Sequence, residues 1–330
     1  MNLKITTPDP FNVLASTKFV LENAKSVKIN EEKIKDLIKP VKAQINKGTT
    51  LATASVGSLR DYKKDCQLVL VENSVNFCFW AEKDKEKWQV EYPKGNIVNG
   101  GWFGLEACFK RSLEKNESIL SAEFLGALTL DDIEKFFQSS NNITIPLLQE
   151  RHKNLGEVGE VLFNKYDGQF MNLLEESSFD TIKIVKNVYE NFSSFKDISK
   201  YMGEDVYFFK RAQITANDID IVLAENKKIK IKNDDVLSAF ADYKLPQILQ
   251  MFGVLEYSEE LAEKVDNFVL ITKDSKEEVE IRAATIWGIE LIRQKIPEYK
   301  SSQIDNAIWL FSQEKQKEAK PYHRTYTIYY

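Results

Sequence analysis

The sequence predicts a mainly helical protein with one small antiparallel β element near residues 67–92. Only 13 glycines and 8 prolines occur among 330 residues, and a many-stranded sandwich or barrel needs more turns than these provide. Helix-start signals recur along most of the chain, and strand-like alternation is concentrated in one stretch. Hydrophobic residues make up 43% of the chain, so it can bury a substantial core. We find no repeat, linker or composition shift, and we therefore expect a single domain over residues 1–330.

Residues 1–65 are expected to form helices. A periodic stretch follows Phe11 and runs to about residue 24. A second helix is predicted after Asn30, because the two glutamates that follow it suit the positive end of a helix.

The β element is predicted from two apolar stretches that lie on either side of a short polar turn. These are residues 68–71 (LVLV) and 75–80 (VNFCFW), separated by ENS. The pattern predicts a hairpin, in which side chains of the second strand alternate between two faces. Residues 88–92 (WQVEY) are predicted to add a third strand.

Residues 100–317 are predicted to form a helical body. Thr129 precedes two aspartates, which is typical of a capped helix start, and Pro146 suits the first turn of another helix. Further helices are predicted over residues 180–191, 204–224, 245–253, 277–295 and 301–317. Residues 318–330 form an aromatic tail that we expect to dock on this body.

Composition and motifs exclude several classes of function. Lys and Arg number 45 against 50 Asp and Glu, which gives a net charge of -5, whereas a duplex nucleic-acid groove needs a dense basic stripe. The glycine-rich fingerprints of dinucleotide and P-loop sites are missing. The histidines His152 and His323 stand far apart, and the three cysteines lack metal-ligand spacing. We therefore expect no metal and no cofactor.

The sequence also bears on location. No apolar run approaches the roughly 18 residues of a membrane span, and the first residues lack the apolar core of a secretory signal. Cys66, Cys78 and Cys108 form an odd, sparse set, which is typical of a reducing compartment. We expect a cytoplasmic protein without membrane contact, and the sequence does not predict its oligomeric state.

Six segments together resemble one known family, and the resemblance runs from about residue 11 to the last tyrosine. The most specific combination is FADYKLPQ at residues 240–247 with FFKRAQ at residues 208–213. The others are NFCFW (76–80), PLLQERH (146–152), GVLEY (253–257), EVEIR (278–282) and the tail PYHRTYTIYY (321–330). This set is similar to the queuosine salvage protein family, also described as queuosine 5′-phosphate N-glycosylases/hydrolases.

The resemblance implies a helical fold related to DNA glycosylases, without a metal. It implies hydrolysis of the N-glycosidic bond of queuosine 5′-monophosphate, or of a related 7-deazaguanine nucleotide or nucleoside. The product would be queuine, which a tRNA transglycosylase can reinsert, and the partner would be a small-molecule nucleotide. A rival hypothesis is a non-catalytic nucleoside- or tRNA-binding helical module that keeps the fold. A third is a helical interaction scaffold.

The resemblance identifies Asp242 as the candidate catalytic residue. Hydrolysis of an N-riboside builds positive charge on the sugar, which a carboxylate stabilises. The same group could orient or deprotonate the water or attack the sugar, and the sequence does not separate these roles. Leu245 and Pro246 predict a helix start, whose positive end favours an ionised Asp242. From spacing alone, the simpler interpretation is a helix cap.

Three basic side chains are candidates for the 5′-phosphate. Lys210 flanks the apolar stripe of its predicted helix, so we expect partial burial and an anionic partner, either a phosphate or Asp242. The alternative is a lysine whose ammonium reaches solvent. His323 and Arg324 are further phosphate candidates, with simple docking of the tail as the alternative.

Four residues are candidates for binding the base. Asp305 matches an aspartate that contacts the base in the family, although periodicity alone predicts a solvated helix position. Phe240 carries over as a base-contacting aromatic side chain. Trp80 and Trp102 could form walls of a base pocket. For Phe240 and both tryptophans, core packing is the alternative.

The chain departs from the family pattern near the base. Asn306 stands where members place a tyrosine, and Leu310 where they place a second aspartate; residues 50–55 offer no histidine. Queuine carries a charged aminomethyl-cyclopentenediol arm, so a lost carboxylate removes a partner for its ammonium. We expect weaker discrimination for the arm, unless Glu106 or Asp61 supplies the missing contact.

Overall fold

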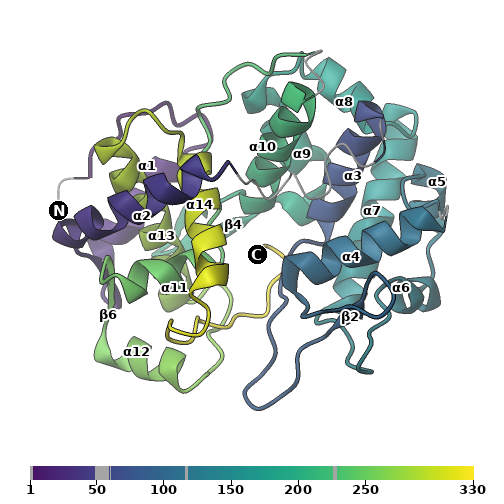
Figure 1. The fold of residues 1–330 in the computed structure, drawn as a ribbon. Helices are drawn as coiled ribbons and strands as arrows, with labels where there is room; N and C mark the ends of the chain where they lie inside the picture. The colour runs from purple at the N-terminus through teal and green to yellow at the C-terminus, as the bar shows by residue number, and fades with distance from the viewer. Residues whose placement is uncertain (1–2, 49–58, 60, 116–117, 226–228) are drawn as a thin grey trace. The chain divides into compact units, whose positions relative to one another are not determined.

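A computed structural model of the chain describes residues 3–48, 59, 61–115, 118–225 and 229–330. Within these ranges the protein is mainly helical and carries three small two-stranded antiparallel sheets (Figure 1). The predicted fold class is therefore confirmed at this level. The chain forms two compact units, each assembled from three separate stretches of sequence. The single domain over residues 1–330 and the likeness to DNA glycosylases stay predictions.

Unit 1 comprises Met1–Ala54, Asp197–Asn217 and Asn233–Tyr326. Its longest helix is α13 (Lys276–Lys295), which is buried without interruption from Glu278 to Ile292. In Figure 1 the purple N-terminal helices lie beside the yellow-green C-terminal ones. The helices that pack on α13 are α1 (Val13–Asn23), α2 (Ile34–Asn46), α11 (Lys244–Met251) and α14 (Ser301–Glu314). Unit 1 also contains η1 (Glu31–Lys33) and α12 (Glu259–Asp266).

Two of the small sheets belong to unit 1. β1 (Val27–Ile29) pairs with β6 (Leu255–Tyr257), so the N-terminal stretch is hydrogen-bonded to a strand more than 200 residues later. β4 (Ile198–Tyr201) and β5 (Glu204–Tyr207) form a tight hairpin. The helix predicted over residues 204–224 is therefore wrong at its start, because these first residues pair with β4. The helix α10 (Lys210–Glu225) occupies the rest.

Unit 2 comprises Ser55–Lys196, Asp218–Lys232 and Thr327–Tyr330. Edge-to-face aromatic contacts fill part of its core, with ring centroids 4.9 Å apart for Phe109 and Phe136, and 4.8 Å apart for Phe136 and Phe137. Its elements are α3 (Tyr62–Ser74), β2 (Val90–Glu91), β3 (Ile97–Val98), α4 (Gly101–Glu114), α5 (Ala122–Ala127), α6 (Leu130–Phe136), α7 (Leu148–Tyr166), α8 (Phe170–Glu176), α9 (Thr181–Asn191) and η3 (Ser193–Phe195).

The predicted hairpin near residues 67–92 is wrong. Residues 68–71 lie inside α3, whose N-cap Asp61 accepts the N–H of Lys63 at 3.0 Å, and residues 75–80 form no regular element. Every residue of α3 from Asp65 to Ser74 is buried. A helix that is buried on all sides has no polar face, so its sequence resembles a central strand. The predicted third strand does contain β2, which pairs with β3.

Several predicted helices are confirmed, including α9, α13 and α14. Thr129 caps α6 in a reciprocal capping box with Asp132. Pro146 lies just before α7, which begins at Leu148 after a left-handed Leu147 (φ 55°). Among the described residues, no helix combines the length and the apolar composition needed to cross a membrane.

Candidate functional site

Asp242 lies at the N-terminus of α11, where its Oδ1 accepts the backbone N–H groups of Lys244 at 2.8 Å and Leu245 at 2.9 Å. The capping role that spacing suggested is therefore present, but it occupies one carboxylate oxygen. The side chain is buried. Burial raises the pKa of the Asp242 carboxyl, and the nearby Lys210 ammonium, the two N–H groups and Lys244 oppose that rise.

Asp305 is a second buried carboxyl group beside Asp242. It lies on α14, and its Oδ2 accepts the backbone N–H of Phe240 at 2.7 Å. Burial is the largest cause that raises the pKa of Asp305 to about 8, and the negative charge of Asp242 raises it further. The Phe240 bond and Lys210 act in the opposite direction. Asp305 therefore holds a proton at neutral pH while it fixes the backbone of the segment that carries Asp242.

The segment that leads to Asp242 is also fixed by α10. Gln213 donates from Nε2 to the hydroxyl of Ser238 at 3.0 Å, and its Oε1 accepts the N–H of Ser238 at 2.9 Å. Phe240 itself is 4% exposed, so both the family role and core packing remain consistent with its position.

Lys210 is the first residue of α10 and is only 6% exposed. The expected partial burial is therefore confirmed. Its ammonium lowers the pKa of the carboxyl groups of both Asp242 and Asp305. Of the two anionic partners considered for Lys210, the carboxylate is thus present in the protein itself.

A second basic group lies around Tyr322. The ammonium of Lys244 is 4.7 Å from the centre of the Tyr322 ring, and the guanidinium carbon of Arg324 is 4.8 Å from the same centre. Arg324 also lies 4.3 Å from the ring of Phe268. Both cations are less than a tenth exposed. Two cations on one ring create a local positive potential that suits an anion.

His323 lies in the same tail but has a different character. It is 1% exposed, and burial together with the charges of Arg282 and Arg324 lowers its pKa to about 3. The imidazole is therefore neutral at pH 7 and supplies no charge for a phosphate. Within this predicted pair, Arg324 is the cation.

Trp80 and Trp102 both belong to unit 2. Trp80 is 2% exposed and follows a segment held by Arg151, which donates to the carbonyls of Val75, Phe77 and Cys78. The guanidinium of Arg151 also lies 4.4 Å from the centre of the Phe77 ring. Two of the segments that carried the resemblance, residues 76–80 and 146–152, therefore meet through this arginine. Trp102 lies in the first turn of α4 and is part-exposed.

The two residues considered as substitutes for the missing arm contacts have other partners. Glu106 pairs with the ammonium of Lys110 at 2.5 Å. Asp61 caps α3. Asn306 and Leu310 both lie on α14, and residues 50–55 lie outside the described residues.

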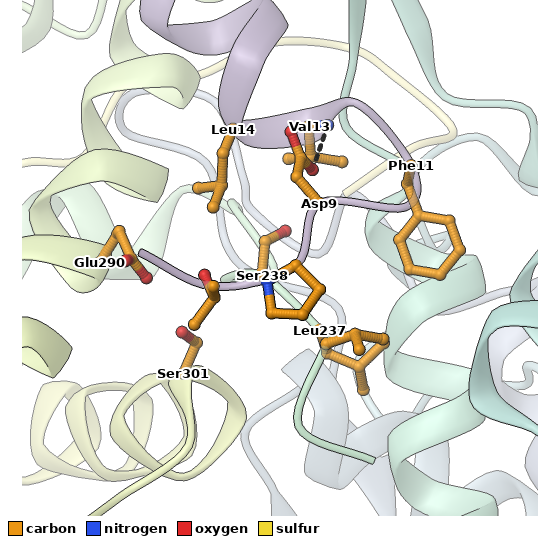
Figure 2. A pocket seen from close by; sticks show the side chains of 11 residues that line it. Asp9, Phe11, Val13, Leu14, Leu237, Ser238, Glu290 and Ser301 are labelled. Carbon is orange, nitrogen blue, oxygen red and sulfur yellow. Dashed lines mark hydrogen bonds between the residues drawn. The ribbon is translucent and has the colours of Figure 1, made fainter. Parts of the chain in front are cut away.

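A pocket of about 240 Å³ lies elsewhere in unit 1, beneath the N-terminal segment (Figure 2). Its acids are already bonded, because Asp9 accepts the N–H of Val13 at 2.8 Å and Glu290 pairs with Arg293 at 2.7 Å. It is lined by Thr7, Pro8, Asp9, Phe11, Val13, Leu14, Val236, Leu237, Ser238, Glu290 and Ser301. None of the residues predicted for the site lines it, so we do not assign the substrate to this pocket.

The structure adds three residues that sequence reasoning did not single out. Lys244 stands two residues after Asp242, inside the FADYKLPQ segment, so the motif itself was the available signal. Asp197 and Arg282 form a buried ion pair next to Lys210, and their partnership spans 85 residues without a local pattern. Among the described residues, no group of three or more His, Cys, Asp or Glu side chains is placed to hold a metal ion.

Comparison with known proteins places this chain among a set of close relatives. A family model described as "Queuosine salvage protein" matches residues 58–330. The queuosine 5′-phosphate N-glycosylase/hydrolase of Sphaerobacter thermophilus is 35% identical over 327 residues, which cover 98% of each chain. The mouse protein of the same name is 31% identical over 337 residues, which cover 97% of this chain and 99% of the mouse chain. The Schizosaccharomyces pombe protein is 28% identical over 326 residues.

Proposed function

Because the chain belongs to the queuosine salvage protein family, we propose that it hydrolyses the N-glycosidic bond of queuosine 5′-monophosphate and releases queuine for salvage into tRNA. The family resemblance seen in the sequence is thereby confirmed. The observation that carries the activity is the pair of buried carboxyl groups, Asp242 and Asp305, beside the ammonium of Lys210.

Asp242 is the group that meets the developing positive charge. Cleavage of the bond between C1′ and the base nitrogen leaves its electron pair on the base and an oxocarbenium-like sugar. An ionised Asp242 stabilises this sugar and orients the water that adds to C1′. Lys210, Lys244 and two N–H groups favour that ionised state against burial. One proton of the water leaves through solvent or the carboxylate, and the hydroxyl stays on the ribose.

Asp305 serves the departing base. A 7-deazaguanine has carbon at position 7, so the base cannot be activated there by protonation as a purine can. A neutral carboxylic acid can instead donate a hydrogen bond to another atom of the base and stabilise its negative charge. The pKa of about 8 keeps Asp305 protonated at pH 7. Its Oδ2 holds the Phe240 backbone, so the acid is fixed in orientation.

The 5′-phosphate is assigned to Arg324 and Lys244. These cations meet at the Tyr322 ring, and Lys244 also lies close enough to Asp242 to lower its pKa. A phosphate held there would lie one ribose away from the reacting carbon. Lys210 is assigned to the carboxylates.

The mechanism uses carboxyl groups and cations of the protein, without a metal or cofactor. We further propose a small-molecule substrate in place of a duplex, a fold related to that of DNA glycosylases, and a cytoplasmic location. The net charge of -5 supports the first, and three buried, free cysteines suit the last.

Turnover of queuosine 5′-monophosphate by the wild-type protein and by Asp242→Asn tests the proposal. The asparagine keeps the Oδ1 acceptor and loses the charge, so we expect a folded protein that binds the nucleotide and loses about 10²–10⁴-fold in rate. Chromatography of released queuine is the measurement. Asp180→Asn is the matched control, because Asp180 caps α9 through the N–H groups of Ile182 and Lys183.

Two results would contradict the proposal. Nucleotide binding without any release of queuine by the wild type would favour the rival binding module. Near-normal turnover by Asp242→Asn would overturn the catalytic assignment while leaving the activity in place. A loss of rate in Asp180→Asn equal to that in Asp242→Asn would show that the effect comes from lost capping.

A further inference from the structure

A buried ion pair lies behind the first residue of α10. Nη1 of Arg282 donates to Oδ1 of Asp197 at 2.9 Å, and Nη2 donates to Oδ2 at 2.6 Å. Both side chains are 1% exposed. The guanidinium and the carboxylate therefore meet edge to edge through two parallel hydrogen bonds, the arrangement that fixes both groups most firmly.

Asp197 also holds the backbone at the start of α10. Its Oδ2 accepts the N–H of Lys210 at 3.2 Å, and its carbonyl accepts the N–H groups of Phe208 at 3.1 Å and Phe209 at 3.2 Å. Phe209 adopts a left-handed conformation (φ 48°), which turns the chain from β5 into the helix. The guanidinium of Arg282 lies 3.8 Å from the ring centre of Phe208. Three consecutive residues are thus fixed on one ion pair.

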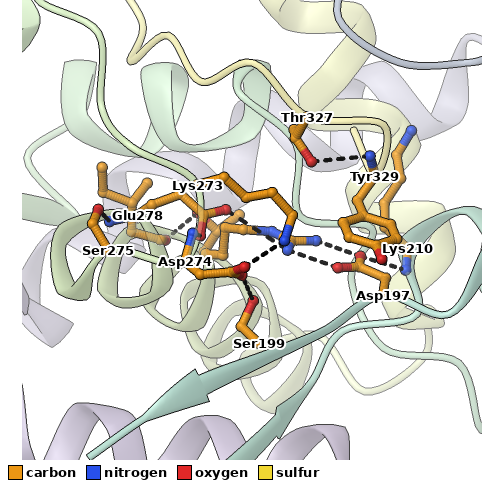
Figure 3. A network of polar contacts seen from close by, with 12 residues as sticks. Asp197, Ser199, Lys210, Lys273, Asp274, Ser275, Glu278, Thr327 and Tyr329 are labelled. Carbon is orange, nitrogen blue, oxygen red and sulfur yellow. Dashed lines mark hydrogen bonds and ion pairs between the residues drawn. The ribbon is translucent and has the colours of Figure 1, made fainter. Parts of the chain in front are cut away.

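A further set of polar contacts supports the arginine (Figure 3). Glu278 lies one turn before Arg282 on α13, with 3.8 Å between their charged atoms. Glu278 accepts the N–H of Asp274 at 3.2 Å, and Asp274 accepts the hydroxyl of Ser199 at 2.7 Å. The guanidinium is therefore restrained by acids on two sides.

We propose that Asp197 and Arg282 are positioning residues of the glycosidase site, which fix the start of α10 so that the Lys210 ammonium stays beside Asp242 and Asp305. The inference rests on the proposed function. Neither residue is assigned a contact with the substrate, and both act through Lys210. A buried ion pair is otherwise weak support for stability, because desolvation offsets most of its attraction.

The sign of a pH shift distinguishes positioning from direct electrostatics. The charged groups that face Asp242 are Lys210 from α10, Lys244 from α11 and Asp305 from α14. If Lys210 moves away, the pKa of Asp242 rises, and the acidic limb of kcat/KM moves to higher pH. Loss of the Asp197 charge without movement would lower the pKa of Asp242 and move the limb to lower pH.

The experiment measures kcat/KM against pH for Asp197→Asn, Arg282→Lys and Lys210→Met with queuosine 5′-monophosphate. For the first two we expect a fall of about 10–100-fold at neutral pH, a limb displaced upward, and partial recovery of rate at higher pH. Combining Asp197→Asn with Lys210→Met should cost little beyond Lys210→Met alone, because both act through one ammonium. Arg282→Lys keeps the charge, and so it gives the answer if Asp197→Asn does not fold.

Glu280→Gln is the matched control. Glu280 is equally buried on α13, two residues before Arg282, and it binds Lys25, Ser26 and Tyr201, away from α10. It should lower Tm without moving the limb. Folded Asp197→Asn and Arg282→Lys proteins with the wild-type limb, or a fully additive double variant, would overturn the inference. Failure of the wild type to release queuine would instead contradict the proposed function.

Discussion

Asp242 and Asp305 are both buried, yet their surroundings push them toward different protonation states. Asp242 receives two N–H bonds and the charges of Lys210 and Lys244. Asp305 receives one N–H bond and has Asp242 as a negative neighbour. Two acids with such unequal environments divide into one ionised group and one proton donor. The same pair therefore supplies both the stabiliser of the sugar and the partner of the base.

His323 makes the stability of the fold depend on pH. In the unfolded chain its pKa is near the ordinary 6.5, whereas in the folded protein burial lowers it to about 3. The unfolded state thus takes up a proton first as pH falls, so stability is complete above pH 6.5 and is lost progressively below it. We expect roughly 2 kcal/mol of loss from this group between pH 7.5 and pH 5.

Thermal unfolding of His323→Gln at the two pH values measures this effect. The difference in stability between pH 7.5 and pH 5 should shrink by that amount, whatever the glutamine does to stability at either pH alone. His152→Gln is the control, since His152 lies on α7 in unit 2. An unchanged pH dependence in His323→Gln would show that the imidazole does titrate in the folded state.

Arg324→Gln tests the phosphate assignment. A charge-assisted contact is worth about 10–100-fold in kcat/KM, so the wild type should hydrolyse the monophosphate that much better than the nucleoside. The variant should lose this preference mainly on the monophosphate side. Lys320→Gln is a matched control, because this tail lysine pairs at the surface with Asp266 at 2.9 Å. Equal efficiency of the wild type on both substrates would contradict the assignment.

The sequence reached part of the site and stopped where tertiary contacts decide. Motifs identified Asp242, Asp305 and Lys210, and the structure places these three together. It could not separate Arg324 from His323, because the difference lies in how deeply each is buried. Nor could it find Asp197, whose importance depends on an arginine 85 positions away.

At the scale of elements, helices with a polar face were predicted well and α3 was not. Helix α14 has a buried stripe and exposed positions such as Gln303, and its periodicity is visible. Helix α3 has no exposed stripe over its last ten residues, so only its length and capping distinguish it from a strand. The short strands β1 and β6 are three residues each and pair across the whole chain, which no local pattern encodes.

The contact between α5 and α7 depends on a single glycine. A Cβ at Gly159 would lie 2.2 Å from the backbone nitrogen of Gly126 and 2.6 Å from the carbonyl of Ala122. Gly159→Ala should therefore lower the free energy of unfolding by about 1–3 kcal/mol or more, because backbone must move apart. Gly156 lies one turn earlier with nothing within 4 Å of its Cβ position. Gly156→Ala should stabilise the protein by about 0.5–1 kcal/mol. Denaturant unfolding of both variants checks this, and a neutral Gly159→Ala would show that the helices can separate freely.

Helix α14 also bears on selectivity for the base. Leu310 and Asn306 remove polar partners that relatives offer, and the two substitutes considered, Glu106 and Asp61, are engaged elsewhere. We therefore expect weak discrimination between queuosine 5′-monophosphate and the nucleotide of its aminomethyl precursor. Comparison of kcat/KM for the two substrates is the measurement, and Leu310→Asp should sharpen the preference for the arm. A wild-type preference above about a thousandfold would contradict the expectation.

At the scale of the whole molecule, the two units are interleaved along the chain. Unit 1 takes its residues from both ends and from one internal stretch, and unit 2 takes the middle and the last four residues. Helix α10 begins in one unit and ends in the other, with the boundary after Asn217. The proposed positioning pair thus acts on the first turn of the helix that joins them. A truncation at any single point would remove part of both units or leave one incomplete.

The pairing of β1 with β6 has a consequence for synthesis of the protein on the ribosome. The partners of the first helices, α13 and α14, emerge only after more than 270 residues have been made. Until then apolar side chains such as Val20 and Leu37, which end up fully buried, have no native surface to cover them. A nascent chain that must keep such residues unaggregated through most of translation is a natural client for chaperones. Expression at low temperature or with added chaperones should therefore raise the yield of folded protein.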